Sequence, residues 1–340
     1  MKQDKTYATG QNITADDVAT AAGVSRWTVN RAFQKNASIS AKSREKVMQA
    51  ALALGYVPDM RASSLASSRS NLVALLVDDF SNPHKLVMME RLTRILRQNG
   101  WDTLLVNTLS RDDTDDALLN ASQRRVDAVI LIGIQFDDDV LKTARGAGQF
   151  RQLIIYARIS QHPNTISIAV DDKHAMTEIA EYVLSRGYTR PMFLAGPLTY
   201  SAHLIRHETF MNFWKARTGC TPESIGVRAY DSQMAYDRVV KSLSGREPAD
   251  FPDIIVCEND SLAIGATDAL RHHFKLRVPE DIAITGFDDV PQAASPNYNL
   301  TTYRQPLTKM AEYLVEVLDN RASDSEDRLF NGHLVIRDSA

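Results

Sequence analysis

Residues 14–33 read TADDVATAAGVSRWTVNRAF, and this stretch has the pattern of two short helices joined by a tight turn. Thr14, followed three residues later by Asp17, is a capping signature for the first helix. Gly23 supplies the turn, and Ser25 can cap the second helix. Two helices that cross at roughly 90–120° in this way form the helix-turn-helix that reads DNA. The competing interpretation is an ordinary helical hairpin with a basic face.

The second predicted helix has an inner and an outer side. Val29, Ala32 and Phe33 face inward, which leaves basic, aromatic and amide side chains outside. Arginine is suited to guanine, and tryptophan offers apolar contact to thymine methyl groups. The residues of this unit expected to contact DNA are Thr14, Ser25, Arg26, Trp27, Thr28, Asn30 and Arg31.

A third helix is predicted from Ser40 to the stop signal Gly55. The serine-rich segment that follows, DMRASSLASSRSN at 59–71, has Ala62 and Leu65 at helical spacing. Serine lowers helix propensity, and the segment has no core of its own, so it reads as a linker. We expect it to be helical only when a partner orders it.

The charge of the chain is unevenly distributed. The net charge is −3, but residues 1–70 carry ten Lys and Arg against five Asp and Glu, and the remainder is acidic. A basic end on an acidic body is expected of an attached nucleic-acid-binding unit. The N-terminal arm lacks the apolar core of a secretory signal, and no apolar run is long enough to span a membrane. With only Cys220 and Cys257 present, a cytoplasmic location is expected.

From residue 71 onward, short apolar runs alternate with helix-like segments such as 84–100 and 173–187. Continuous apolar strands between amphipathic helices indicate parallel sheets covered on both faces. Nine strands are many for one sheet, so two doubly wound α/β lobes are predicted. In such sheets ligands bind beyond the carboxyl ends of the strands. The predicted strands are 72–80, 102–108, 127–134, 152–158, 165–170, 190–196, 226–230, 253–259 and 281–287.

Three stretches, DVATAAGVSRWTVNRAF, SAKSREKVMQAALALGYVPD and RASSLA, resemble the headpiece and hinge of the lactose-repressor family of bacterial transcription regulators. The closing HLVIRDSA resembles that family's last strand. The resemblance implies an all-α headpiece on a periplasmic-binding-protein-like core, and a dimer on a pseudo-palindromic operator. It also implies that Ala62 and Leu65 contact the minor groove, with Leu65 as an apolar wedge. Asn30 departs from the family's usual serine, and Thr209 from its usual glycine.

The implied organisation is an arm at 1–12, a headpiece at 13–58, a hinge at 59–70 and an effector-binding and dimerisation domain at 71–340. Lobe one would comprise about 71–170 and 300–328, and lobe two about 171–299 and 329–340.

Polar residues follow the predicted strands, where an effector would bind. Carried over by position, Arg206 matches the family's effector-binding arginine, and Asp288 and Asn259 match two other ligand-side positions. The structural alternatives are that Arg206 pairs with Glu208 or Glu178 and that the acids cap helices. The effector-binding residues expected are Phe80, Arg158, Arg206, Asn259 and Asp288.

These features predict a ligand-responsive DNA-binding repressor that a small polar metabolite, such as a sugar or sugar derivative, releases from its operator. A corepressor-dependent or dual regulator, and a sugar-binding receptor without DNA function, are the alternatives. Catalysis, a cofactor and a metal site are not expected. Gly146 and Gly148 lack the third glycine of a dinucleotide fingerprint, and His272 and His273 lack acidic or cysteine partners at metal spacing. A sugar, sugar phosphate, sugar acid or nucleoside all fit as effector. No heptad tail follows 334–336, so a dimer is expected.

Overall fold

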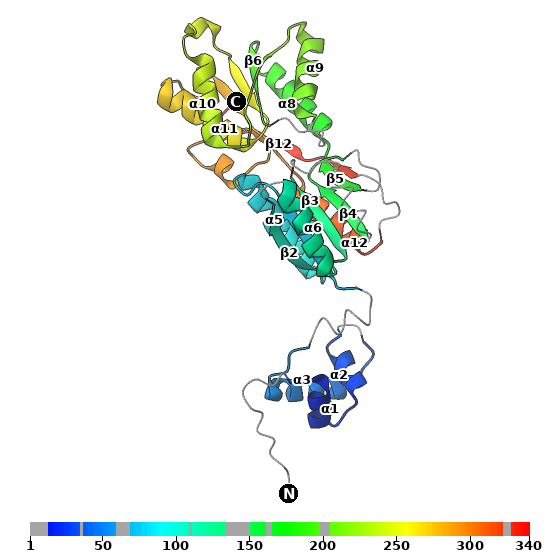
Figure 1. Ribbon diagram of the computed structural model, residues 1–340. Helices are drawn as coiled ribbons and strands as arrows, with labels where there is room; N and C mark the ends of the chain where they lie inside the picture. The colour runs from blue at the N-terminus through cyan, green and yellow to red at the C-terminus, as the bar shows by residue number, and fades with distance from the viewer. Residues whose placement is uncertain are drawn as a thin grey trace. The chain divides into compact units, whose positions relative to one another are not determined.

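The computed structural model describes residues 13–34, 37–58, 69–108, 111–133, 150–160, 165–197, 205–321 and 328–340. The chain divides into two compact units, 1–70 and 71–340 (Figure 1). The predicted arm at 1–12 and the hinge positions Ala62 and Leu65 lie outside the described residues.

Capping residues delimit the helices of the first unit as the sequence predicts. Thr14 and Asp17 form a reciprocal capping box, and Ser25 and Ser40 each accept a backbone N–H with the side chain. Gly23 and Gly55 end their helices in the left-handed conformation, with φ of 65° and 66°, which glycine adopts without steric strain. The helices are α1 (Ala15–Ala22), α2 (Arg26–Ala32) and α3 (Ala41–Leu54).

Small apolar side chains form the core of the first unit and let its helices approach closely. The fully buried members are Val18, Val29 and Val47, and Ala32 is buried in the same cluster. The guanidinium group of Arg44 on α3 donates hydrogen bonds to the backbone carbonyls of Ala32, Gln34 and Ala37. Arg44 therefore bonds to the carbonyl group at the end of α2 and to two carbonyl groups in the segment that follows it.

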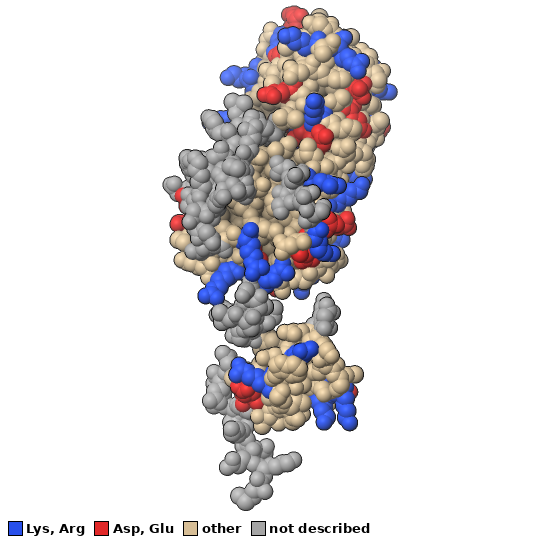
Figure 2. Space-filling view, turned by 90° about the vertical axis from the view of Figure 1, so that its right-hand side faces the viewer, with Lys and Arg blue, Asp and Glu red and all other residues tan. Residues whose placement is uncertain are grey.

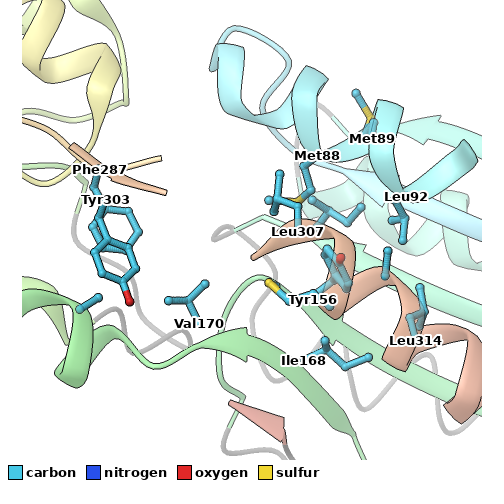
Figure 3. Packing of buried hydrophobic residues seen from close by; sticks show 14 of the residues in the cluster. Met88, Met89, Leu92, Tyr156, Ile168, Val170, Phe287, Tyr303, Leu307 and Leu314 are labelled. Carbon is cyan, nitrogen blue, oxygen red and sulfur yellow. The ribbon is translucent and has the colours of Figure 1, made fainter. Parts of the chain in front are cut away.

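Lobe one of the second unit is a six-stranded, wholly parallel sheet in the order β11-β5-β4-β3-β1-β2. Residues alternate along β1 between two apolar clusters, so that helices cover both faces. Figure 3 shows Met88 and Leu307 in the first of these clusters, beside Tyr156 of the sheet. The elements are β1 (Leu72–Val77), α5 (Pro83–Gln98), β2 (Asp102–Asn107), α6 (Arg111–Gln123), β3 (Ala128–Ile132), β4 (Gln152–Tyr156), β5 (Ile166–Val170), α12 (Leu307–Leu318) and β11 (Arg328–Phe330).

Lobe two is a four-stranded parallel sheet in the order β7-β6-β8-β9, also covered on both faces. Its elements are α8 (Asp172–Ser185), β6 (Pro191–Ala195), α9 (Arg206–Thr218), β7 (Glu223–Gly226), α10 (Ser232–Leu243), η1 (Pro248–Asp250), β8 (Ile254–Cys257), α11 (Asp260–Asp268), η2 (Ala269–His273), β9 (Ala283–Thr285) and η3 (Pro291–Ala294). An antiparallel pair, β10 (Thr302–Arg304) and β12 (His333–Val335), lies where the chain passes between the lobes.

The predicted pair of doubly wound parallel-sheet lobes is confirmed, with one strand misplaced. The prediction at 226–230 is wrong because β7 covers Glu223–Gly226 and pairs with β6. Beyond it the chain turns toward α10, where the Asp231 side chain caps the helix by accepting from the Met234 N–H at 2.8 Å. In the described ranges no helix is both long and apolar enough to cross a membrane.

An edge strand marks the end of lobe one. The strand β11, at Arg328–Phe330, pairs with β5 in lobe one, so the last passage between lobes follows Phe330. Asp171 N–H also donates to the Phe330 carbonyl at 3.0 Å, which ties this edge strand to the start of α8.

Candidate functional site

The outer face of α2 presents an aromatic and cationic surface. Trp27 is 64% exposed, and the guanidinium carbon of Arg31 lies 4.5 Å from the centroid of its ring. Arg26 is exposed and pairs with Asp16 on α1 at 3.1 Å, and Asn30 is exposed beside it. Lys and Arg side chains project from this unit in Figure 2. A helix face of this composition can contact base edges and phosphates.

The three hydroxyl residues predicted to contact DNA have structural partners within the unit. Thr14 caps α1 through Asp17, and the Ser25 hydroxyl lies 2.9 Å from that of Thr28 at the start of α2. Their side chains therefore hold the starts of α1 and α2 in place.

A cavity of about 60 Å³ lies between the two lobes, beyond the carboxyl ends of their strands. Four of the five predicted effector-binding residues line it, and Phe80 does not. Phe80 is half-buried and packs instead against an apolar cluster whose members come from both lobes. The lining residues are Asn82, His84, Lys85, Met88, Ile132, Gly133, Tyr156, Ala157, Arg158, Arg206, Tyr230, Asn259, Asp288 and Gln305.

Arg206 is the first residue of α9 and forms a buried ion pair across to α8. Its Nε lies 2.8 Å from Oδ1 of Asp172, and its Nη1 donates to the Glu258 carbonyl at 3.2 Å. The guanidinium group also stacks over the Phe287 ring at 3.7 Å. Burial by itself would lower the pKa of Arg206, but the Asp172 and Asp288 carboxylates outweigh burial and raise it. Arg206 is therefore a fixed positive charge, paired with neither Glu208 nor Glu178.

Asp288 brings together groups from three parts of the second unit. Its Oδ1 accepts a hydrogen bond from Nε2 of Gln305 at 2.7 Å, and Nε2 of His84 lies 3.8 Å from the same oxygen. His84 belongs to α5 of lobe one, Asp288 follows β9 of lobe two, and Gln305 lies on the segment between lobes. The Asp288 carboxylate thus faces the cavity at the junction of both lobes.

Comparisons with known proteins agree with both units. Residues 14–59 match the bacterial regulatory proteins of the lacI family, and residues 180–340 match a periplasmic binding protein-like domain. The HTH-type transcriptional regulator MalR of Streptomyces coelicolor is 26% identical over 335 residues, covering 95% of each chain. The chain belongs to the lacI family of bacterial regulatory proteins.

Solved structures share the fold over nearly the whole chain. The Lac repressor bound to ONPG in its repressed state has a TM-score of 0.81 at 22% identity, covering 97% of this chain and all of that one. The transcriptional regulator CelR in complex with cellobiose has a TM-score of 0.70 at 23% identity, covering 96% of this chain and all of that one. This lacI-family protein is accordingly a DNA-binding transcription regulator.

In this lacI-family regulator, two further predicted effector-binding residues, Asn259 and Arg158, also interact with other parts of the fold. Asn259 caps α11, where its side chain accepts from the Leu262 N–H at 3.0 Å, so the capping alternative holds for it. Arg158 follows β4, is 2% exposed and has an interaction partner of its own. Both side chains nevertheless line the space between the lobes.

Sequence reasoning missed several residues of the cavity. His84 and Lys85 lie in the first turn of α5, the helix that follows the first strand, and the rule that ligands bind at carboxyl strand ends could have indicated them. The Lys85 ammonium lies 3.0 Å from Oδ1 of Asp78 and donates to the Ile132 carbonyl at 3.2 Å. No local sequence pattern indicated Gln305 as a cavity residue, because only the tertiary structure brings it to Asp288.

Glu258 and the cavity-lining residue Tyr230 pack around Gly196. The Glu258 carboxylate accepts the Gly196 N–H, and burial raises the pKa of Glu258 to about 7. A Cβ atom at Gly196 would lie 2.1 Å from the Tyr230 ring, so only glycine fits there. Burial likewise raises the pKa of Tyr230, which keeps its hydroxyl protonated beside the cavity.

Proposed function

We propose that this regulator is a repressor whose affinity for its operator is controlled by a small polar metabolite bound between the two lobes. The observation that carries this proposal is the meeting of Asp288 of lobe two with His84 of lobe one at a polar cavity. A ligand placed there touches both lobes at once. Its binding therefore depends on how the lobes are arranged.

Linkage gives the mechanism. A ligand that binds one arrangement of the lobes more tightly shifts the protein toward it, and the shift is limited by that difference in affinity. Because the coupling is reciprocal, operator DNA must weaken an inducer's binding by the same factor that the inducer weakens operator binding. Such coupling is typically about 1–3 kcal/mol.

In the cavity, Arg206 and Asp288 are proposed as the main polar contacts to the effector, with Arg158 and Asn259 beside them. Charge-assisted hydrogen bonds from such groups are about twice as strong as neutral ones. The structure of CelR is a cellobiose complex, so sugars are the first class of effector to test.

At the operator, Arg26, Trp27 and Arg31 are proposed to read base edges. Ala62 and Leu65 of the hinge, which lie outside the described residues, are proposed to enter the minor groove. We place this activity in the cytoplasm, where the chain meets DNA.

A homodimer is the proposed assembly, and exposed leucines on lobe one support it. Leu86 of α5, Leu105 of β2 and Leu119 of α6 are 55%, 52% and 54% exposed. Since β2 is an edge strand of the sheet, a second copy of the chain could cover this side. Sedimentation at micromolar protein tests the dimer, and a tetramer would contradict it.

The experiment that tests the proposed function has two stages. Selection from random DNA should return a pseudo-palindromic sequence, and fluorescence anisotropy should then show its release by a metabolite. A metabolite that tightens operator binding instead would identify a corepressor. Failure to select any sequence, by a folded protein, would contradict the proposal. Arg31→Ala is the control, because it should keep salt-sensitive non-specific DNA binding and lose the preference for the selected sequence.

A further inference from the structure

His84 is a buried polar residue whose ring nitrogens have no role in holding the fold. Its side chain is 5% exposed, lines the cavity and lies on the lobe opposite Asp288. Neither Nδ1 nor Nε2 makes a hydrogen bond to any residue that the structure describes. Its backbone N–H donates to Oδ1 of Asn82, the cap of α5, at 3.0 Å, which fixes the residue at the helix start.

The surroundings of His84 keep its imidazole neutral. Burial lowers the pKa of His84, Arg206 and Lys85 lower it further, and only Asp288 raises it. A neutral imidazole has one N–H donor and one acceptor nitrogen. At 3.8 Å from Oδ1 of Asp288, Nε2 is beyond hydrogen-bonding distance of that carboxylate.

One hydroxyl group placed beside this pair of atoms can reach both of them. An oxygen about 2.8 Å from both Nε2 and Oδ1 subtends an angle near 90° between them, so it can accept from one and donate to the other. Two more polar atoms in the cavity, Oη of Tyr230 and Oε1 of Gln305, are buried without a hydrogen-bond partner among the described residues. A ligand that carries several hydroxyl groups would satisfy all of them.

The cations that line the cavity have carboxylates beside them. The lining cations are Lys85, Arg158 and Arg206, and the carboxylates beside them are Asp78, Asp172 and Asp288. Lys85 is paired with Asp78 at 3.0 Å and Arg206 with Asp172 at 2.8 Å. A phosphate or carboxylate ligand would bring a further negative charge into a buried site that already holds the Asp288 carboxylate, which is unfavourable.

Building on the proposed function, we propose that His84 determines effector specificity. Its imidazole and the Asp288 carboxylate bind the same hydroxyl group of an uncharged monosaccharide or polyol, one from each lobe. The effector hydroxyl thereby bonds to His84 of one lobe and to Asp288 of the other.

The class of effector is tested first, by thermal unfolding of the full chain with matched probes. D-glucose, D-galactose, D-ribose and myo-inositol are compared with D-gluconate, D-glucuronate and D-glucose 6-phosphate. We expect at least one uncharged probe, and none of the anions, to raise the melting temperature. Stabilisation by anions only, or by no uncharged probe, would overturn the inference. Operator selection would still stand in either case, so the proposed function is judged separately.

The role of His84 is tested with the uncharged probe that binds, by calorimetry. His84→Phe should weaken binding about tenfold or more, because a phenyl ring keeps the shape but cannot bond to a hydroxyl. His84→Gln, which keeps a donor and an acceptor, should stay within about threefold. His174→Phe is the matched control, since His174 is exposed on α8. Unchanged binding in both His84 variants would overturn the assignment.

A double-mutant cycle asks whether the two residues share one hydroxyl. If they do, His84→Phe combined with Asp288→Asn should weaken binding by less than the product of the single effects. In the natural chain, a deoxy analogue that lacks the shared hydroxyl group should bind more weakly than the probe. In the same variants this difference in affinity should disappear, and it should do so for one ring position only. Fully multiplicative effects would show that His84 and Asp288 bind separate groups, and would overturn the shared-hydroxyl arrangement.

Discussion

Asp288 and Asp289 are consecutive, yet their carboxylates bind different parts of the molecule. Asp288 faces the cavity and accepts from Gln305 at 2.7 Å. Asp289 accepts from Nε of Arg304 at 2.5 Å and from Nη2 of Arg337 at 2.6 Å, at the two strands that pass between the lobes. Both residues have positive φ, of 118° and 54°, which turns the two side chains apart. The cavity between the lobes and the inter-lobe strands are therefore joined through a single peptide unit.

The different partners of these two residues predict separable defects. Asp288→Asn should lower effector affinity at least about tenfold and leave unfolding nearly unchanged, because asparagine tolerates positive φ and can still accept from Gln305. Asp289→Asn should destabilise the protein by about 1–3 kcal/mol, because it weakens two charge-assisted hydrogen bonds. Calorimetry and chemical unfolding measure the two effects. A stable Asp289→Asn protein would contradict the structural role given to Asp289.

Arg206 is predicted to matter for folding as well as for effector binding. Arg206→Ala leaves Asp172 buried without its partner, and breaking a buried pair typically costs about 3–5 kcal/mol. Adding Asp172→Asn should recover part of that loss. The double variant should then bind operator normally and fail to respond to effector. If Arg206→Ala unfolds at the same denaturant concentration as the natural chain, the ion pair has no structural role.

Stability should depend on pH through Glu258. Its pKa is about 7 in the folded protein, against an ordinary value of 4.5. The folded state thus holds the Glu258 proton more tightly than the unfolded state does. The stability that this proton contributes is fully present below pH 4.5 and is lost as pH rises through about 7. The difference corresponds to about 3 kcal/mol. Glu258→Gln should therefore gain stability relative to the natural chain between about pH 5 and pH 8.

Urea unfolding across this range checks the Glu258 prediction. Glu247→Gln, at an exposed position, is the control and should follow the natural chain at every pH. A constant difference between Glu258→Gln and the natural chain would show that Glu258 does not titrate near neutrality.

Arg31 is predicted to specify bases, with Trp27 holding its guanidinium group in place. Arg31→Ala should flatten the preference at one symmetric pair of bases, since a bidentate arginine contact is worth about 1–3 kcal/mol of discrimination. Lys46→Ala, an exposed cation on α3, should leave the selected sequence unchanged. Selection from random DNA gives both results. An unaltered sequence preference in Arg31→Ala would place base recognition elsewhere.

The sequence by itself determined the headpiece and the general plan of the lobes. The helix ends there depend on contacts within a few residues, such as Thr14 with Asp17 and the left-handed Gly23 and Gly55. Buried parallel strands can also be predicted from the sequence, because both faces of the sheet are covered and each strand is therefore a continuous apolar run.

Only the tertiary structure decided the features that depend on contacts between distant residues. The strands β10 and β11 have three residues each and exist through their pairing with β12 and β5. Arg206 pairs with Asp172 on another helix, and not with Glu208 or Glu178. His84 becomes a candidate binding residue only because folding brings it close to Asp288 on the opposite lobe. Local patterns fix local geometry, whereas a binding cavity is made by side chains that only folding brings together.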